Sequence, residues 1–289
     1  MKKKFLAVML VATMTLSLCA CDLLSKNEEP KEEQIVQEED VQEKEVQEEP
    51  VEKKEVEEVA SDENAEVDEN ADKETSGTVS LADAKVGDIV VFGQYEQDGD
   101  GANGSEPIEW EVLEVSGNRA LLISRYVLDC KPYNEQAAAV TWETCTLRTW
   151  LNGDFYNTAF NDDEKSKIPE VTLSNPDNDF YGGIEGGNDT NDKVFLLSVE
   201  EILKYYGGDW YNADNGYGFC DRLVISATQV AKDNGAYTRD NGSLWWLRSP
   251  GLNSNRACDV YEDGCVGWDY SSNVHERKDG VRPAIYVEY

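Results

Sequence analysis

The chain has few reactive side chains, which narrows the chemistry that it could perform. His275 is the only histidine among 289 residues, so a metal site built from several histidines is excluded. A Ser-His-Asp triad would have to use His275, which lies beside the charged residues Glu276 and Arg277. This setting disfavours nucleophilic catalysis, and we expect a protein that is not an enzyme.

Aromatic and small polar side chains gather near the end of the chain, in residues 252–279. Aromatic rings beside amides and hydroxyls suit the binding of sugars or protein surfaces. A surface hairpin without a ligand fits the same composition. The candidate ligand-binding residues in this segment are Asn253, Asn255, Trp268, Tyr270 and His275.

Two loops rich in Asp, Asn and Gly, residues 98–104 and 186–192, resemble calcium loops. The first begins with Asp98 and Asp100 but lacks an oxygen ligand at its fifth position and a glycine at its sixth, so it does not match an EF-hand. A turn between two strands is the simpler interpretation. We expect no cofactor, with Ca²⁺ as the alternative.

Five cysteines follow Cys21, so at least one thiol must be unpaired. Exported proteins in oxidising surroundings usually avoid free thiols, which suggests a reducing habitat. Simple buried thiols are the preferred interpretation. The five are Cys130, Cys145, Cys220, Cys258 and Cys265.

The first residues predict an export signal that ends at Cys21. Three lysines precede an apolar stretch, residues 5–18, that is too short to span a membrane. Leu18-Cys19-Ala20-Cys21 resembles a lipobox, in which the last thiol is alkylated with diacylglycerol before the chain is cut. We expect residues 1–20 to be a lipoprotein signal peptide and Cys21 to anchor the protein on the outer face of the cell membrane. An unlipidated signal peptide is the alternative.

The next segment predicts a disordered acidic spacer. Residues 27–76 contain 22 Asp or Glu, five Lys and no aromatic residue, so they cannot offset the entropy lost on ordering. Residues 21–78 therefore form the lipidated N-terminus and the spacer, with a long charged helix as the alternative. The net charge of the chain, −33, disfavours nucleic acid and leaves cationic peptides, cell-wall amines or divalent cations as partners.

Residues 79–289 contain all seven Trp and all fourteen Tyr and predict one globular domain. Period-two patterns predict strands at both ends, in residues 86–95, 108–112, 119–123, 243–247, 256–261, 266–270 and 281–287. Helical spacing and caps predict helices in residues 146–160, 160–165, after Ser198 and in 228–233. Strands at both ends with helices between them indicate an α+β fold of antiparallel strands with a few helices.

Several blocks together resemble a large bacterial family of domains of unknown function. The most specific are Trp245-Trp246-Leu247-Arg248-Ser249-Pro250-Gly251 and Gly280-Val281-Arg282-Pro283-Ala284; residues 86–90, 108–110, 120–124, 147–152 and 192–198 are also similar. The C-terminal pattern resembles C-type-lectin-like folds, which include sulfatase-modifying enzymes and variable bacterial surface receptors. The resemblance implies a single lectin-like domain with ligand loops in residues 252–279, and no established activity.

Four residues of the two signature blocks can be interpreted individually: Arg248, Arg282, Trp245 and Trp246. A guanidinium that stacks on Trp and binds main-chain carbonyls can hold a loop-rich region, and we expect this of Arg248 and Arg282, with direct ligand contact as the alternative. Trp245 and Trp246 are adjacent, so in a strand they face opposite ways. We expect Trp245 in the core and Trp246 as a candidate for the binding surface.

The resemblance to sulfatase-modifying enzymes, which use a close cysteine pair, directs attention to Cys258 and Cys265. Asp263-Gly264 predicts a hairpin turn that puts Cys265 opposite Tyr261 or Glu262. Cys258 then lies about 10–13 Å further along, beyond the ~7 Å reach of a disulfide. We therefore expect no bond between them.

These expectations combine into one interpretation: a lipid-anchored, surface-exposed bacterial lipoprotein whose non-catalytic domain binds a cell-wall or host carbohydrate or a protein. An extracytoplasmic enzyme related to sulfatase-modifying oxidases is the first alternative. A structural envelope protein without a small ligand is the second.

Overall fold

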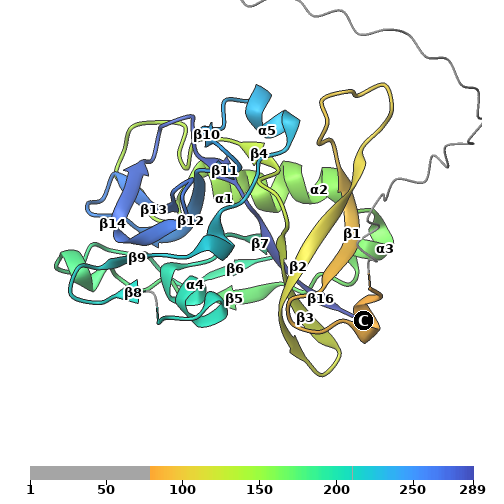
Figure 1. The fold of residues 1–289 in the computed structure, drawn as a ribbon, viewed down its shortest axis with the longest axis horizontal. Coiled ribbons are helices and arrows are strands. Elements are labelled where there is room, and N and C mark those ends of the chain that lie inside the picture. The colour runs from red at the N-terminus through yellow and green to blue at the C-terminus, as the bar shows by residue number, and fades with distance from the viewer. Residues whose placement is uncertain (1–78, 210) are drawn as a thin grey trace, which may run out of the picture. The chain divides into compact units, whose positions relative to one another are not determined.

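The computed structural model describes residues 79–209 and 211–289 (Figure 1). These residues form mostly antiparallel sheets with a few short helices, so the predicted α+β class is confirmed. The predicted signal peptide, Cys21 and the acidic spacer lie outside the described residues. None of the helices in the described ranges has the length and apolar character needed to cross a membrane.

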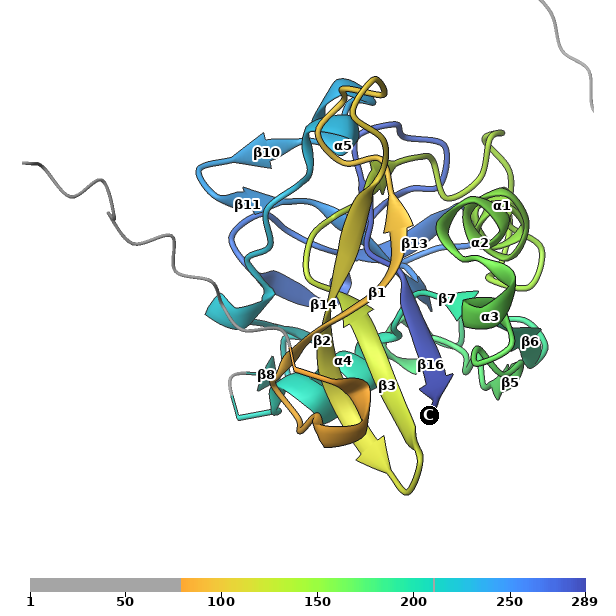
Figure 2. The same cartoon turned by 90° about the vertical axis from the view of Figure 1, so that its right-hand side faces the viewer.

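A five-stranded sheet begins with a three-stranded meander, in which the strands predicted in residues 86–95, 108–112 and 119–123 are confirmed. Its order is β1 (Ile89–Tyr95), β2 (Glu106–Ser116), β3 (Arg119–Ser124), β16 (Ala284–Glu288) and β7 (Val194–Phe195), and every pairing is antiparallel. Gly117 makes the β2–β3 turn with a φ of +63°. Figure 2 shows β3 and β16 side by side, although they come from opposite ends of the described chain.

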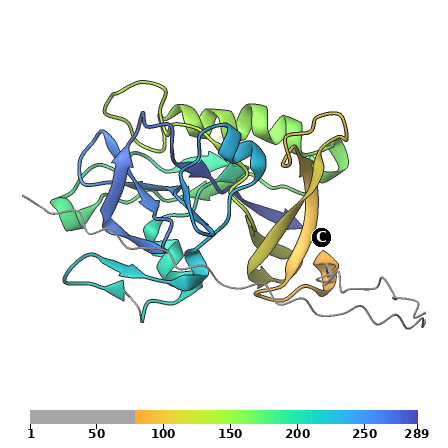
Figure 3. The ribbon, with the colours of Figure 1, turned by 45° about the horizontal axis from the view of Figure 1, so that its top comes forward.

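The predicted helix over residues 146–160 is present but is not uniform. It consists of α1 (Thr146–Trp150), a π-helical turn (Leu151–Phe155) and α2 (Tyr156–Ala159), and Figure 3 shows it as one continuous run. The Tyr156 N–H donates to the carbonyl of Leu151, five residues earlier, which defines the wider turn.

The other predicted helices are confirmed at their caps. Asn161 and Ser198 each form a capping box, with Glu164 and Glu201, that starts α3 (Asp162–Lys165) and α4 (Val199–Tyr206). Thr228 caps α5 (Gln229–Asp233). Short 3-10 turns lie at Leu81–Asp83, Asp179–Tyr181 and Asp221–Leu223.

A seven-stranded sheet contains the signature blocks. Its order is β4 (Asp129–Cys130), β15 (Gly280–Val281), β12 (Trp245–Pro250), β13 (Arg256–Val260), β14 (Cys265–Asn273), β9 (Tyr217–Phe219) and β8 (Tyr211–Asn212). Only β12 and β15 pair in parallel within it. Two small sheets pair β5 (Val171–Leu173) with β6 (Thr190–Asp192) and β10 (Thr238–Arg239) with β11 (Gly242–Ser243).

The helical run packs on the five-stranded sheet through aromatic side chains. Phe160 lies 5.6 Å from Phe92 and 6.3 Å from Trp110, measured between ring centroids, and all three are buried. Gly93, in the bulge of β1, has a φ of +76°, and a Cβ there would lie 2.6 Å from the Phe160 ring. Glycine at this position therefore permits the close approach of helix and sheet.

Candidate functional site

The residues predicted to bind a ligand do not form one site. Asn253 and Asn255 lie in the loop between β12 and β13, where the Asn255 carbonyl accepts a hydrogen bond from the Val274 N–H at 3.0 Å. The neighbouring His275 is exposed and makes no hydrogen bond or ion pair within the described residues. Trp268 and Tyr270 lie in a bulge of β14, because β13 pairs with Val266 and then only with Ser271 and beyond.

Trp246 is buried, so the prediction that it lines a binding surface is wrong. Both Trp245 and Trp246 have no exposed area. The Trp246 indole N–H donates to the Lys131 carbonyl at 2.9 Å, and its ring lies 5.6 Å from that of Tyr133. The alternation rule assumed one solvent-facing side, whereas β12 lies inside the sheet and all six of its residues are buried.

Arg282 has the structural contacts that its signature block led us to expect. Its side chain is 1% exposed, and its guanidinium lies 4.9 Å from the centre of the Trp245 ring. Its Nε donates to the Ser124 carbonyl at 2.8 Å, and its Nη2 lies 3.4 Å from a carboxylate oxygen of Glu111. The group thus joins the end of β15 to the β2–β3 meander.

Arg248, a residue of β12, makes similar structural contacts. It is 5% exposed and pairs with both carboxylate oxygens of Glu201, the residue that closes the α4 capping box. It also donates to the carbonyls of Leu196 at 2.9 Å and Ser174 at 3.3 Å. Both signature arginines therefore bond to other groups of the protein, although Nε of Arg248 and Nη1 of Arg282 are buried without a hydrogen-bond partner in the described residues.

Tyr270 belongs to a packed aromatic cluster, whereas Trp268 is partly buried against the hydrophobic core. The Tyr270 ring lies 5.3 Å from Tyr217 and 4.8 Å from Tyr261, in both cases edge to face. A hydrogen bond with the Cys265 thiol raises the pKa of Tyr270, and burial raises it further. These contacts make Tyr270 a packing residue at this end of the sheet.

A cleft with a volume of about 560 Å³ opens where three loops meet, and we call it the acidic cleft. The Ser254 carbonyl accepts a hydrogen bond from the Val140 N–H at 3.0 Å, and the Asn178 amide donates to the Pro250 and Gly251 carbonyls. These bonds fix the loops around 140, 178 and 254 against one another. The lining residues are Ala139, Val140, Thr141, Glu143, Thr144, Asp177, Glu185, Gly187, Asn188 and Ser254.

Among the described residues that line the acidic cleft, three carry carboxylates and none is Lys, Arg or His. Hydrogen bonds from Asn188 lower the pKa of Glu143. Asp177 accepts one hydrogen bond, from the Gly186 N–H at 3.0 Å, and Glu185 makes none within the described residues. The lining therefore presents net negative charge to a ligand, although Arg148, outside the lining, acts on Glu143.

Sequence reasoning missed these three carboxylates as a group. Glu143 precedes the first long helix, whereas Asp177 and Glu185 flank a turn in a different loop. The only sequence signal for Asp177 and Glu185 is the Gly-, Asn- and Asp-rich composition of residues 175–192. Within that segment, residues 186–192 suggested only a calcium loop. Ser254, between the two predicted asparagines, is the single point where the predicted segment reaches the cleft.

The five cysteines from Cys130 onward are buried and unpaired. Cys265 lies opposite Tyr261, whose N–H donates to the Cys265 carbonyl, so the predicted hairpin register is confirmed. Burial raises the pKa of Cys130 and of Cys145 to about 12 and that of Cys265 to about 11. Such thiols stay protonated near neutral pH and are poor nucleophiles.

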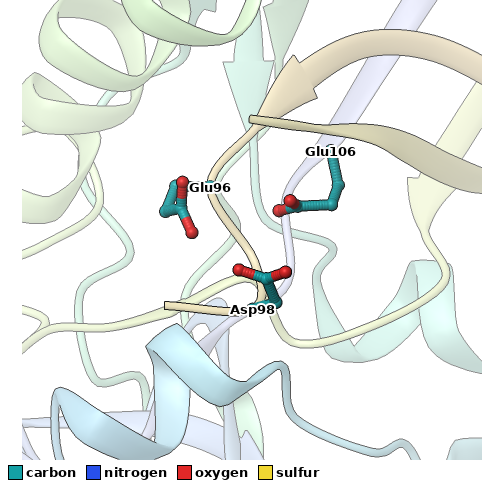
Figure 4. Close-up of side chains that lie close together, drawn as sticks. All are labelled: Glu96, Asp98 and Glu106. Atoms are coloured by element: carbon teal, nitrogen blue, oxygen red, sulfur yellow. The ribbon is translucent and has the colours of Figure 1, made fainter. Parts of the chain in front are cut away.

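Three carboxylates lie together at the base of the first predicted calcium loop, residues 98–104, which itself contributes only Asp98 to the group. Ligand atoms of Glu96, Asp98 and Glu106 lie within 4.8 Å of one another, and Figure 4 shows the three groups around one space. Each already accepts main-chain hydrogen bonds, from Gly99, Asp100 and Gln97 respectively. Their contacts describe a turn joining β1 to β2, as the simpler interpretation of this loop predicts.

Two carboxyl groups, Asp259 on β13 and Asp279 before β15, are buried against each other. Both have no exposed area, and the two carboxyl groups act on each other's pKa. Burial raises the pKa of Asp259 to about 6, and burial together with the Asp259 charge raises that of Asp279 well above its usual range. No Lys, Arg or His nitrogen of the described residues lies within 4 Å of either group. Burial therefore favours the neutral, protonated form of this pair over the charged form.

Comparisons with known proteins identify a family for most of the domain. The domain of unknown function DUF6273 matches residues 117–289, which include the acidic cleft, both signature arginines and the buried carboxyl pair. No curated protein and no solved structure matches the chain. The match covers more than half of the sequence, and the chain therefore belongs to the DUF6273 family.

Proposed function

We propose that this protein is a lipid-anchored, surface-exposed binding protein whose non-catalytic domain holds an amine-bearing glycan in the acidic cleft. The observation that carries the proposal is the cleft itself, with about 560 Å³ of space and three carboxylates unopposed by a lining cation. An ammonium group would gain Coulomb energy there. Thr141, Thr144 and Ser254 add hydroxyls that can bind the hydroxyls of a sugar.

The placement of the protein supports this class of ligand. The lipobox-like sequence before Cys21 and the acidic segment that follows it suit a tether outside the membrane, where cell-wall amines are within reach. Because the cut follows alkylation of the thiol, Cys21→Ala should abolish incorporation of labelled palmitate into the protein and should leave residues 1–20 attached. Equal palmitate incorporation in the variant and in the unmodified protein would exclude a lipid anchor at Cys21.

The oxidase alternative receives little support from the thiols. Cys258 and Cys265 are buried with raised pKa values, and neither forms a disulfide. An enzyme of that type needs an accessible thiolate.

Titration calorimetry on the full chain with a fully deacetylated chitosan tetramer tests the proposal. We expect binding that weakens as salt rises from about 50 to about 500 mM, because the attraction is electrostatic. Asp177→Asn with Glu185→Gln should weaken it by roughly tenfold or more, a loss of about 1.4 kcal/mol. The amide introduced by Asp177→Asn keeps an oxygen that can accept from the Gly186 N–H, so the loop is preserved.

The matched control is Asp83→Asn with Glu170→Gln, which removes the same charge from two exposed positions outside the cleft. We expect this control to bind as the unmodified protein does. Equal weakening in both double variants would show a diffuse charge effect and would overturn the acidic cleft as the binding site.

A further inference from the structure

A second groove lies along the first turns of the long helical run, apart from the residues of the acidic cleft. It has a volume of about 390 Å³ and is formed by residues 131–135 and 146–154. Its lining residues are Lys131, Pro132, Glu135, Thr146, Leu147, Thr149, Trp150, Gly153 and Asp154. We call it the Trp150 groove.

The π-helical turn shapes one wall of this groove. Leu151 and Phe155 point into the core and are fully buried, whereas Gly153 and Asp154 line the groove. A Cβ on Gly153 would have no atom within 4 Å, so this glycine borders open space and is not required by packing. Single π turns inside helices occur frequently at functional sites.

Trp150 supplies a partly exposed aromatic ring to the groove. Its ring lies 5.5 Å from the buried Phe155, which fixes its position. Its indole N–H has no hydrogen-bond partner within the described residues. The Lys131 ammonium lies 4.6 Å from the ring centre and also 3.9 Å from the Asp129 carboxylate. Lys131 therefore keeps Asp129 as a partner if a ligand displaces it from the Trp150 ring.

The charges of the Trp150 groove differ from those of the acidic cleft. One ammonium, Lys131, faces two carboxylates, Glu135 and Asp154, and Thr146 and Thr149 add hydroxyls. Donors and acceptors are thus mixed beside an aromatic ring. Such a lining suits a ligand that is apolar on one face and carries hydroxyls around its edge.

We propose that the Trp150 groove is a second binding site, which takes an uncharged pyranose unit stacked on Trp150. The axial C–H face of the sugar would lie on the indole ring, and its hydroxyls would bind the indole N–H, Lys131 and Asp154. This proposal is independent of the acidic cleft, because the two sites share no lining residue.

Nuclear magnetic resonance of the full chain tests the site directly. The chain has seven tryptophans, and Trp150→Phe identifies the Trp150 indole N–H signal by its disappearance. Addition of fully acetylated chitotetraose or of maltotetraose should shift that signal. If neither sugar shifts it, or if other indole signals move and this one does not, the proposal is wrong.

Two substitutions of Gly153 form a matched pair, because one fills the groove with a large side chain and the other adds only a methyl group. Gly153→Leu should raise the Kd of the shifting sugar at least tenfold, whereas Gly153→Ala should change it less than twofold. Neither substitution removes a contact, and both favour the helix more than glycine does. An unchanged Kd in Gly153→Leu would overturn the assignment. The Asp177→Asn, Glu185→Gln double variant should leave this binding intact, so failure of either site is recognised separately.

Discussion

Charged groups are buried on both sides of the short strand β15, and the two sides neutralise them differently. Arg282, just after the strand, is stacked on Trp245 and paired with Glu111. Asp279, just before it, is buried beside another carboxyl group, Asp259, and has no Lys, Arg or His nitrogen within 4 Å among the described residues. The charge of Arg282 is balanced by the opposite charge of Glu111, whereas burial of Asp279 and Asp259 favours their protonated form. The stability contributed by Arg282 should therefore change little with pH near neutrality, whereas that contributed by the two carboxyl groups should change with pH.

The largest expected effect comes from breaking the arginine side. Arg282→Ala leaves Glu111 without its buried partner and removes the stacking on Trp245, so we expect a loss of about 3–5 kcal/mol in the free energy of unfolding. Urea denaturation of the full chain measures it.

Arg222→Ala is the matched control, because Arg222 binds the other oxygen of the same carboxylate at 3.2 Å but is 57% exposed. Its loss should cost less than about 1 kcal/mol. Similar costs for the two variants would mean that burial does not set the strength of these pairs.

An intermediate effect, dependent on pH, is expected on the carboxyl side. Folding raises the pKa of Asp259 to about 6, so between about pH 4 and 6 the folded protein binds more protons than the unfolded chain. Stability supplied by this group is complete below about pH 4 and is lost as pH rises through about 6. The double variant Asp259→Asn, Asp279→Asn removes the titration of both groups, and its stability relative to the unmodified protein should rise by at least about 3 kcal/mol over that range, the amount due to Asp259 alone.

Thermal denaturation from about pH 4 to about pH 8 compares the two proteins, with Glu170→Gln as an exposed control. A constant difference between the carboxyl variant and the unmodified protein at all pH values would contradict a shared proton.

The smallest effect should come from an ion pair at the surface. Arg277 and Glu135 are in contact, but their side chains are 66% and 54% exposed. A double-mutant cycle with Arg277→Ala and Glu135→Gln should give a coupling of less than about 1 kcal/mol, and less at high salt. A coupling as large as that of Arg282 would remove the distinction between buried and exposed charge.

Local signals predicted the fold well. The caps that start the predicted helices after Asn161 and Ser198 join residues three apart, so the sequence alone contains both partners. The buried arginines followed from a recognisable block. The short strands β5 to β9 were not predicted, because two or three residues carry no measurable period.

The candidate sites were harder to predict because they are built from distant segments. Glu143, Asp177 and Ser254 meet only when three loops fold together, and nothing in any one loop marks the others. Trp246 was misplaced since the alternation rule cannot tell a half-exposed strand from one covered on both faces. The π turn was hidden because Leu147, Leu151 and Phe155 fit an ordinary helix equally well.

The position of β16 between β3 and β7 has a consequence for the order of folding. The meander β1–β2–β3 joins neighbours and can form early, but Ala284 pairs with Ile123, about 160 residues away along the chain. Closing so long a loop loses chain entropy before any stabilising contact has formed. We expect slow folding in which an open three-stranded meander, with the edge of β3 unpaired, precedes the complete sheet. In that interval the exposed β3 edge is where an incompletely folded molecule would pair with another copy.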